Sequence, residues 1–136
     1  MYLLDTNMVS ELRRLRPHPK VVAWLRSTPE SNLRLSAVTL GEIQRGIEQL
    51  RPQDPAKAAE IEAWTDRLEA TFAILPVDAP AFRLHARLMR LKPAPTREDA
   101  LIAAVAIRNG LTVVTRNVSE FAKLDAPHFD PFTAAP

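Results

Sequence analysis

The chain has 136 residues, of which 46% are hydrophobic and 25% charged, with a formal net charge of +2. These values suit one folded domain over residues 1–136 and argue against a disordered chain. No apolar run approaches the roughly 20 residues of a membrane span, and cysteine is absent, which excludes a disulfide framework and a thiolate metal site. We therefore expect a cytoplasmic protein that does not contact a membrane.

The first seven residues combine an apolar run with a polar end. Residues 2–4 predict a short buried strand, and Thr6 and Asn7 are typical of the start of a helix. Asp5 would then lie at the carboxyl end of the strand, which is where open parallel sheets bind ligands. Taken alone, this stretch favours helix capping as the role of Asp5.

Hydrophobic periodicity predicts strands that alternate with helices along the rest of the chain. The expected helices cover residues 7–15, 21–28, 39–50, 58–72, 80–91 and 96–110, and the expected strands cover 33–37, 74–77 and 111–114. We expect the tail, residues 125–132, to add an irregular edge strand. This alternation predicts an α/β fold with a mostly parallel sheet of four to five strands, whose carboxyl ends meet at one edge.

Two further acids lie near the expected starts of helices. Thr39 with Glu42, and Thr96 with Asp99, have the spacing of a capping box, in which hydroxyl and carboxylate each accept a free backbone N–H. The helix over 96–110 is apolar on nearly all sides, which predicts a central helix. Asp99 would therefore be held against the core.

Because parallel strands share one carboxyl edge, we expect Asp5, Glu42, Asp99 and the turn 117–120 to converge. Four separate helix caps could produce the same list, but capping accepts Ser and Asn, whereas these positions favour carboxylates. Clustered acids repel and need a counter-charge, which Mg²⁺ or Mn²⁺ supplies through oxygen ligands. The matching chemistry is phosphodiester hydrolysis by a metal-activated water.

Basic side chains gather in two stretches. One lies between the first two helices and contains Arg13, Arg14, Arg16, His18 and Lys20. This cluster has two interpretations, first a solvated loop and second a site that contacts phosphate. In the second stretch, three arginines lie about one helical turn apart and form a basic stripe, namely Arg83, Arg87 and Arg90.

Four segments, residues 3–7, 36–42, 98–104 and 115–121, together resemble a PIN-domain ribonuclease. Within that family, the chain is most similar to the VapC and FitB-type toxins of bacterial toxin–antitoxin pairs. The resemblance covers nearly the whole chain in order. It implies a three-layer α/β/α fold around the parallel sheet.

The resemblance also implies roles for individual residues. Three acids would be catalytic residues and metal ligands, namely Asp5, Glu42 and Asp99. Supporting side chains would be Thr6, Asn7 and Thr115. Arg116 would contact the substrate. The family often has its fourth acid where this chain has Asn117, so we expect Asn117 in the fourth catalytic position and Glu120 in a supporting, capping-box position.

The family further implies an RNA substrate, a cognate antitoxin and a homodimer or higher toxin–antitoxin assembly. A different class remains open, a non-catalytic PIN-like module that binds nucleic acid or a partner, which Asn117 would favour if it marks a decayed site. A phosphatase with Asp5 as nucleophile is a third interpretation, although Asn7 stands where a second acid would be wanted.

Overall fold

The computed structural model describes residues 1–133. Its five strands form one parallel sheet in the order β3-β2-β1-β4-β5. The strands are β1 (Tyr2–Leu4), β2 (Leu33–Ser36), β3 (Ala73–Leu75), β4 (Thr112–Val114) and β5 (His128–Phe129). The predicted parallel sheet is confirmed, and its carboxyl ends therefore lie at one edge.

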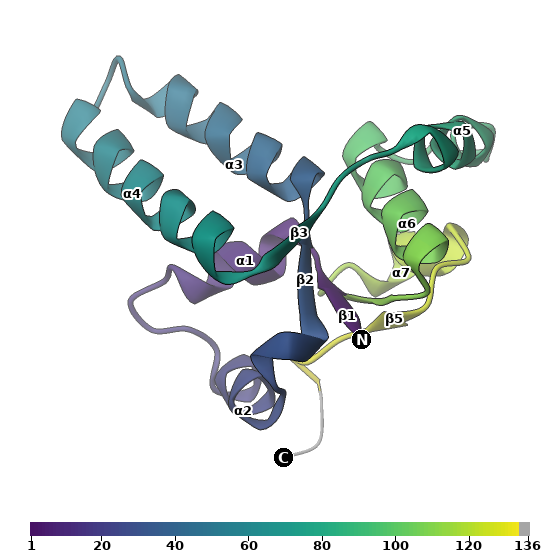
Figure 1. Cartoon of the computed structure of the whole chain (residues 1–136), viewed down its shortest axis with the longest axis horizontal. Helices are drawn as coiled ribbons and strands as arrows, with labels where there is room; N and C mark the ends of the chain where they lie inside the picture. The colour runs from purple at the N-terminus through teal and green to yellow at the C-terminus, as the bar shows by residue number, and fades with distance from the viewer. Residues whose placement is uncertain (134–136) are drawn as a thin grey trace.

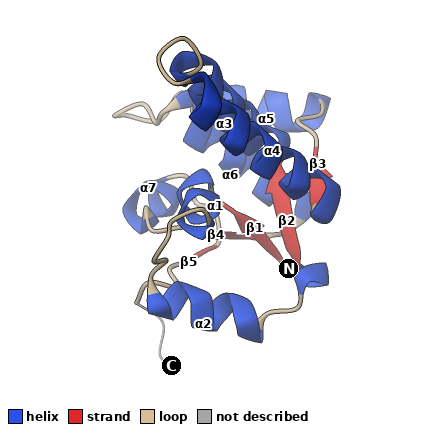
Figure 2. Ribbon diagram, turned by 90° about the vertical axis from the view of Figure 1, so that its left-hand side faces the viewer, coloured by secondary structure: helices blue, strands red, loops and turns tan. Residues whose placement is uncertain are grey.

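Helices cover both faces of this sheet, as Figures 1 and 2 show. They are α1 (Thr6–Leu12), α2 (Pro19–Ser27), α3 (Ala37–Leu50), α4 (Pro55–Thr71), α5 (Ala79–Leu88), α6 (Arg97–Asn109) and α7 (Val118–Lys123), with a short 3-10 helix at Glu30–Asn32. In Figure 1, α3 and α4 form a pair on the left of the sheet, and α5, α6 and α7 lie on its right. Within residues 1–133 no helix has the length and apolar character needed to cross a membrane.

The strands separate two hydrophobic cores because successive side chains point to opposite faces. Leu3 and Val113 pack with α5, α6 and α7, whereas Leu4 and Val114 pack with α1, α2 and α4. Residues 100–106 of α6 are all buried, so the prediction of a central helix is confirmed. The three-layer α/β/α arrangement expected from the resemblance is also present.

The first helix is shorter than its apolar spacing predicts. It ends at Leu12, and Leu15 lies beyond it with its side chain fully exposed. The reason is the buried carboxylate of Glu11, which accepts hydrogen bonds from Arg14 at 3.1 Å and from the backbone N–H of His18 at 2.8 Å. These bonds turn the chain before Leu15 can continue the helical face.

The predicted start of α3 at Thr39 is wrong. The helix begins at Ala37, because Ser36 at the end of β2 accepts the N–H of Val38 at 3.1 Å and caps the helix. Thr39 and Glu42 therefore lie inside the helix and form no capping box. Their side chains are free to contact another element, which brings Glu42 to the candidate site.

Candidate active site

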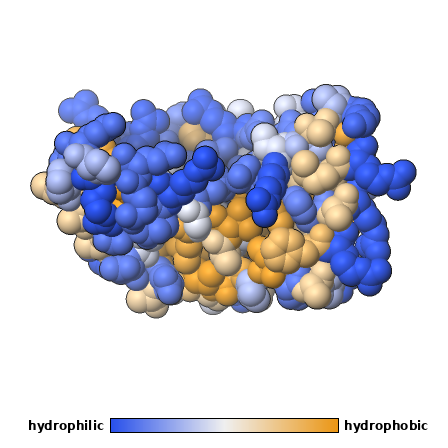
Figure 3. Space-filling model, turned by 90° about the horizontal axis from the view of Figure 1, so that it is seen from above, coloured by the Kyte–Doolittle hydropathy of each residue, from blue (hydrophilic) through white to orange (hydrophobic). Residues whose placement is uncertain are grey.

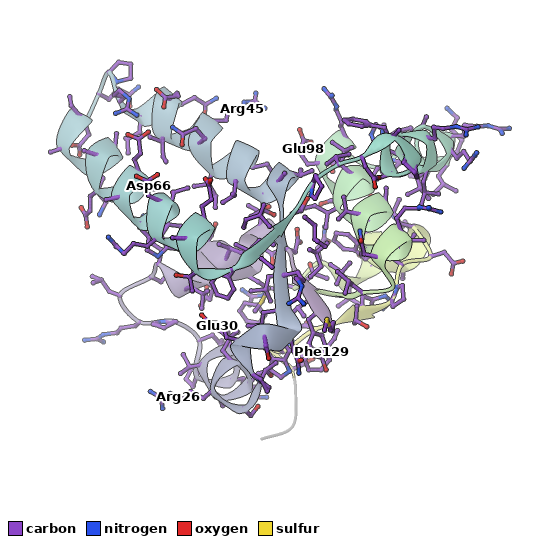
Figure 4. All side chains as sticks on the ribbon, viewed as in Figure 1. Arg26, Glu30, Arg45, Asp66, Glu98 and Phe129 are labelled. Carbon is purple, nitrogen blue, oxygen red and sulfur yellow. The ribbon has the colours of Figure 1, made fainter. Side chains whose placement is uncertain are left out.

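A cavity of about 590 Å³ lies at the carboxyl edge of the sheet, beside the ends of β1 and β4. Its lining consists of Asp5, Thr6, Asn7, Ser10, Glu11, Arg13, Arg14, Glu42, Asp99 and Asn117. Figure 4 labels Glu98 at the start of α6, close to the beginning of α3, and these are the two helices that carry Asp99 and Glu42. The structure thus brings together Asp5, Glu42, Asp99 and Asn117.

Asp5 is both the cap of α1 and the most buried of these acids, with only 4% of its surface exposed. Its Oδ1 accepts the Thr6 N–H at 2.8 Å, and its Oδ2 accepts Thr115 Oγ1 at 2.8 Å and Asn7 Nδ2 at 3.1 Å. Burial raises the pKa of Asp5, the charge of Asp99 raises it further, and the hydrogen bonds from Thr115 and Thr6 oppose both effects. Capping and a site role therefore coexist at this residue.

Glu42 of α3 is joined to the start of α1 through a hydroxyl. Thr6 Oγ1 donates to Glu42 Oε1 at 2.8 Å and lies 3.0 Å from the hydroxyl of Thr39, which is completely buried. Burial raises the pKa of Glu42, and the negative charges of Asp5, Glu98 and Asp99 add to this rise against the hydrogen bond from Thr6. Thr39 therefore supports the site. This role was not predicted, because the position of Thr39 in the sequence suggested a helix cap.

Asp99 lies in the first turn of α6, where its backbone N–H donates to Thr96 Oγ1 at 3.2 Å. This is the hydroxyl half of the predicted capping box. The carboxylate Oδ2 instead faces Asn117, whose Nδ2 lies 3.5 Å away. Burial raises the pKa of Asp99, and the charges of Glu120 and Glu98 raise it further.

Asn117 precedes α7, but the expected capping box with Glu120 is wrong. The backbone N–H of Asn117 donates to Thr115 Oγ1 at 2.9 Å, and within residues 1–133 its side chain forms no capping hydrogen bond with α7. Asn117 lines the cavity and Glu120 does not. Glu120 therefore acts on Asp99 only through its charge.

Arg116 does not line the cavity either. Its guanidinium stacks 4.4 Å from the centre of the Phe132 ring, near the end of the described chain. A cation–π contact of this kind holds the side chain against the tail. The substrate contact expected of Arg116 remains a prediction.

Four cavity residues were not among the predicted site residues, and all come from α1 or the turn after it: Ser10, Glu11, Arg13 and Arg14. Ser10 follows Thr6 by four positions and therefore shares its helical face, a spacing that was visible in the sequence, whereas Arg14 lies beyond the end of α1 at Leu12. Although burial opposes ionisation of Glu11, hydrogen bonds from His18 and Arg14 and the charges of Arg14 and Arg116 lower its pKa overall. Arg14 is thus committed to Glu11 rather than to the acids of the site.

The three clustered acids have the donor chemistry that a hard cation requires. Among residues 1–133, no cation pairs with Asp5, Glu42 or Asp99, and no donor lies within hydrogen-bonding distance of Glu42 Oε2 or Asp99 Oδ1. In the same part of the chain, no three His, Cys, Asp or Glu side chains are arranged to hold one metal ion. The oxygens fit Mg²⁺ or Mn²⁺ in kind, and their side chains must draw closer to share one ion.

The sequence and the fold of this chain are similar to those of known proteins. The family model described as PIN domain matches residues 2–127. Toxin FitB of Neisseria gonorrhoeae is 34% identical, with 97% of this chain and 99% of FitB aligned, and VapC ribonuclease Y4jK of Sinorhizobium fredii is 31% identical, with 99% and 100% aligned. The crystal structure of FitAcB from Neisseria gonorrhoeae matches with a TM-score of 0.84 at 33% identity, over 98% of this chain and 100% of that one.

A structure of FitAB bound to an IR36 DNA fragment matches with a TM-score of 0.88 at 31% identity, over 100% of this chain and 99% of that one. The resemblance to FitB and VapC proteins inferred from four sequence segments is therefore confirmed over almost the whole chain. With its parallel sheet and its acids at the carboxyl edge, this chain belongs to the PIN-domain family.

Proposed function

We propose that this protein is a Mg²⁺- or Mn²⁺-dependent endoribonuclease and the toxin of a toxin–antitoxin pair. The observation that carries the proposal is the convergence of Asp5, Glu42 and Asp99 on one cavity, each with a raised pKa. Three acids that repel each other cost stability unless they bind something positive. The names of the relatives, Toxin FitB and VapC ribonuclease, agree with this chemistry.

The chain's own residues would orient the carboxylates for this task. Thr115 and Asn7 donate to Asp5 Oδ2, and the Thr6 N–H donates to Oδ1, which leaves one lone pair of Oδ1 for a ligand. The Thr6 hydroxyl donates to Glu42 Oε1 and leaves Oε2 available. When bound, Mg²⁺ or Mn²⁺ supplies a water of lowered pKa and neutralises charge that develops on the phosphate. Asn117, beside Asp99, would take the fourth position as a neutral oxygen ligand or as a hydrogen-bond partner of a water.

The partners follow from the relatives. The solved neighbours include FitAcB and a toxin–antitoxin complex from Klebsiella pneumoniae, the latter 25% identical with a TM-score of 0.72. We infer that this chain binds a cognate antitoxin and forms a homodimer or a higher toxin–antitoxin assembly. Its substrate would be RNA.

One observation favours a second candidate, a PIN-like module that binds nucleic acid or a partner without cleaving it. Asn117 occupies the place where the sequence comparison with PIN-domain toxins leads us to expect an acid. A site with three carboxylates could then bind a metal too weakly for catalysis. Metal-dependent cleavage separates the two candidates.

The test uses purified protein, a fluorescent single-stranded RNA, and either MnCl₂, MgCl₂ or EDTA. We expect cleavage with a metal and none with EDTA. Asp5→Asn keeps the shape and the capping oxygen of Asp5 but removes the charge of a proposed ligand, so cleavage should fall at least about 100-fold, as for loss of a transition-state charge interaction. Asp66→Asn is the matched control, because Asp66 is exposed on α4, away from α6 (Figure 4).

Expression in a host without the antitoxin gives the cellular form of the test. The parent and Asp66→Asn should arrest growth, and Asp5→Asn should not. If Asp5→Asn cleaves RNA and arrests growth as strongly as the parent, the nuclease proposal fails. If no variant cleaves but all bind RNA, the binding module is correct.

A further inference from the structure

One basic segment of this protein contains no acid and lies outside the acid cavity. Residues 79–97, which comprise α5 and the loop that leads into α6, contain five basic residues and no acid: Arg83, Arg87, Arg90, Lys92 and Arg97. The rest of the chain contains 13 basic and 16 acidic residues, a net charge of −3. Residues 12–29 also contain five basic residues and no acid, but Arg13 and Arg14 of that stretch line the cavity of the acids, whereas no residue of 79–97 does.

Part of this segment surrounds a second cavity of about 600 Å³ between α5 and α6. Three arginines line it, Arg83 and Arg87 from α5 and Arg108 from the last turn of α6. The other lining residues are apolar: Ala79, Pro80, Leu84 and Ile107. Seen from above, hydrophobic surface lies near the middle of the molecule, between hydrophilic side chains at its two ends (Figure 3).

The three arginines are not part of structural ion pairs. All three are exposed, and the ion pairs formed among residues 1–133 involve Arg14, Arg51 and Lys57 instead. Side chains at positions 83 and 87 are one turn apart on the same face of α5, so their like charges repel. An anion in the cavity would relieve this repulsion.

The arginine cavity is connected to the acid cluster through α6. Asp99 in the first turn and Arg108 in the last turn are separated by nine residues, a rise of about 14 Å along the helix. The first turns of α5 lie beside the end of α6, and the chain then returns through Arg90 to Arg97 at the start of α6. The basic stripe therefore leads from the cavity toward the edge that carries Asp99.

We propose that the cavity of Arg83, Arg87 and Arg108 binds backbone phosphates of the RNA substrate a few nucleotides from the bond that is cleaved. This inference rests on the proposed nuclease function. A stacked strand rises about 3.4 Å per nucleotide, so about four nucleotides or fewer span the distance to Asp99. Arginine's planar fork suits phosphate oxygens, and the apolar wall can cover a ribose or a base face.

An acidic protein segment is the other occupant that three arginines could bind. The alignment of the stripe with the acid cluster favours RNA, because one continuous strand would reach both places. A protein partner would have no need of this alignment. The test therefore measures RNA affinity and oligomeric state on the same variants.

The experiment measures the affinity of Asp5→Asn protein for a fluorescent 12-nucleotide single-stranded RNA by anisotropy, at several salt concentrations. In this background we compare the triple change Arg83→Gln, Arg87→Gln and Arg108→Gln with a charge-matched triple change. The matched positions are exposed and lie on other helices: Arg26 on α2, Arg45 on α3 and Lys123 on α7, the first two labelled in Figure 4. Circular dichroism and thermal melting show that each variant is folded.

We expect the cavity variant to bind at least about 10-fold more weakly and to lose about 2 from the slope of log affinity against log salt, since each phosphate contact on a single strand contributes about 0.7. The matched variant should stay within about twofold of the Asp5→Asn protein. Equal affinity and equal slope in the two triple variants would overturn the inference, as would an Asp5→Asn protein that binds no RNA. Unchanged RNA affinity with a smaller mass in light scattering would assign the cavity to a protein contact instead.

The outcomes separate this inference from the proposed function. If the parent cleaves RNA with metal and the cavity variant loses no affinity, only the proposal that the cavity binds RNA is rejected. Loss of affinity in the cavity variant together with a parent that never cleaves RNA would reject the nuclease and leave the cavity as an RNA-binding site without a neighbouring cleavage site.

Discussion

Thr115 Oγ1 donates a 2.8 Å hydrogen bond to Asp5 Oδ2 and thereby joins two side chains that are 110 positions apart in the sequence. The same hydroxyl accepts the backbone N–H of Asn117 at 2.9 Å. Thr115 is completely buried at the end of β4, beside β1. One hydroxyl therefore positions the first acid and the turn that carries Asn117.

We predict that Thr115→Val destabilises the protein and impairs cleavage. Valine has nearly the same shape but removes the Thr115 donor from Asp5 Oδ2, which then keeps only the bond from Asn7, and leaves the Asn117 N–H without its acceptor. Loss of a partner for buried polar groups costs about 1–3 kcal/mol. Urea denaturation should report this loss at neutral pH. Thr115→Ser retains the hydroxyl and should keep most of the cleavage activity; equal activity in the Val and Ser variants would contradict a positioning role.

For Asp99→Asn we predict a melting temperature of the metal-free protein that is unchanged or higher. The cap of α6 is the hydroxyl of Thr96, which still accepts the backbone N–H of residue 99 after the change. The change removes a charge that Glu120 and Glu98 repel. Added Mg²⁺ or Mn²⁺ should stabilise the parent more than the variant. Thr96→Ala provides the contrast, with an expected cost of about 0.5–2 kcal/mol. A clear loss of stability in Asp99→Asn without a metal response would identify Asp99 as a structural residue.

The stability difference between the parent and Asp99→Asn should also depend on pH. Burial and repulsion raise the pKa of Asp99 in the folded protein above its ordinary value of 3.8. The folded protein then holds this proton more tightly than the unfolded chain, so the contribution of Asp99 to stability is complete below the ordinary pKa and is lost as pH rises through the raised value. Without metal, the free energy of unfolding of Asp99→Asn should therefore increase relative to that of the parent from about pH 4 upward. Urea titrations at several pH values, with EDTA, measure the difference; a constant difference would show that Asp99 is not destabilised by ionisation.

The fourth position of the site can be assigned by calorimetric titration with Mn²⁺ and Mg²⁺. We predict that Asn117→Asp tightens metal binding, because Asn117 faces Asp99 across the cavity and a carboxylate there adds charge. Glu120→Gln should leave metal affinity nearly intact, because Glu120 does not line the cavity. The reverse result, with binding abolished by Glu120→Gln and unaffected by Asn117→Asp, would make Glu120 the fourth acid.

Much of the fold and of the candidate site could be predicted from local patterns. The apolar run before Asp5, the alternation of strands with helices and the apolar helix after Asp99 are local features, and parallel pairing alone then directs every strand's carboxyl end to one edge. The convergence of Asp5, Glu42 and Asp99 follows from that topology, even though the cap assumed for α3 was wrong.

Tertiary structure decided which side chains share a hydrogen bond. Sequence spacing cannot choose between Ser36 and Thr39 as the cap of α3, because both residue types cap helices. In the structure β2 ends at Ser36, which is the cap, and the Thr39 hydroxyl contacts Thr6 instead. Likewise, the sequence showed the stripe, of which Arg83 and Arg87 lie on α5 and Arg90 lies beyond its end at Leu88. The cavity also required Arg108, which approaches Arg83 and Arg87 only because α5 packs against α6. The sequence by itself determines residue types and periodicity, whereas contacts between distant residues depend on how elements cross, which only packing of the whole chain establishes.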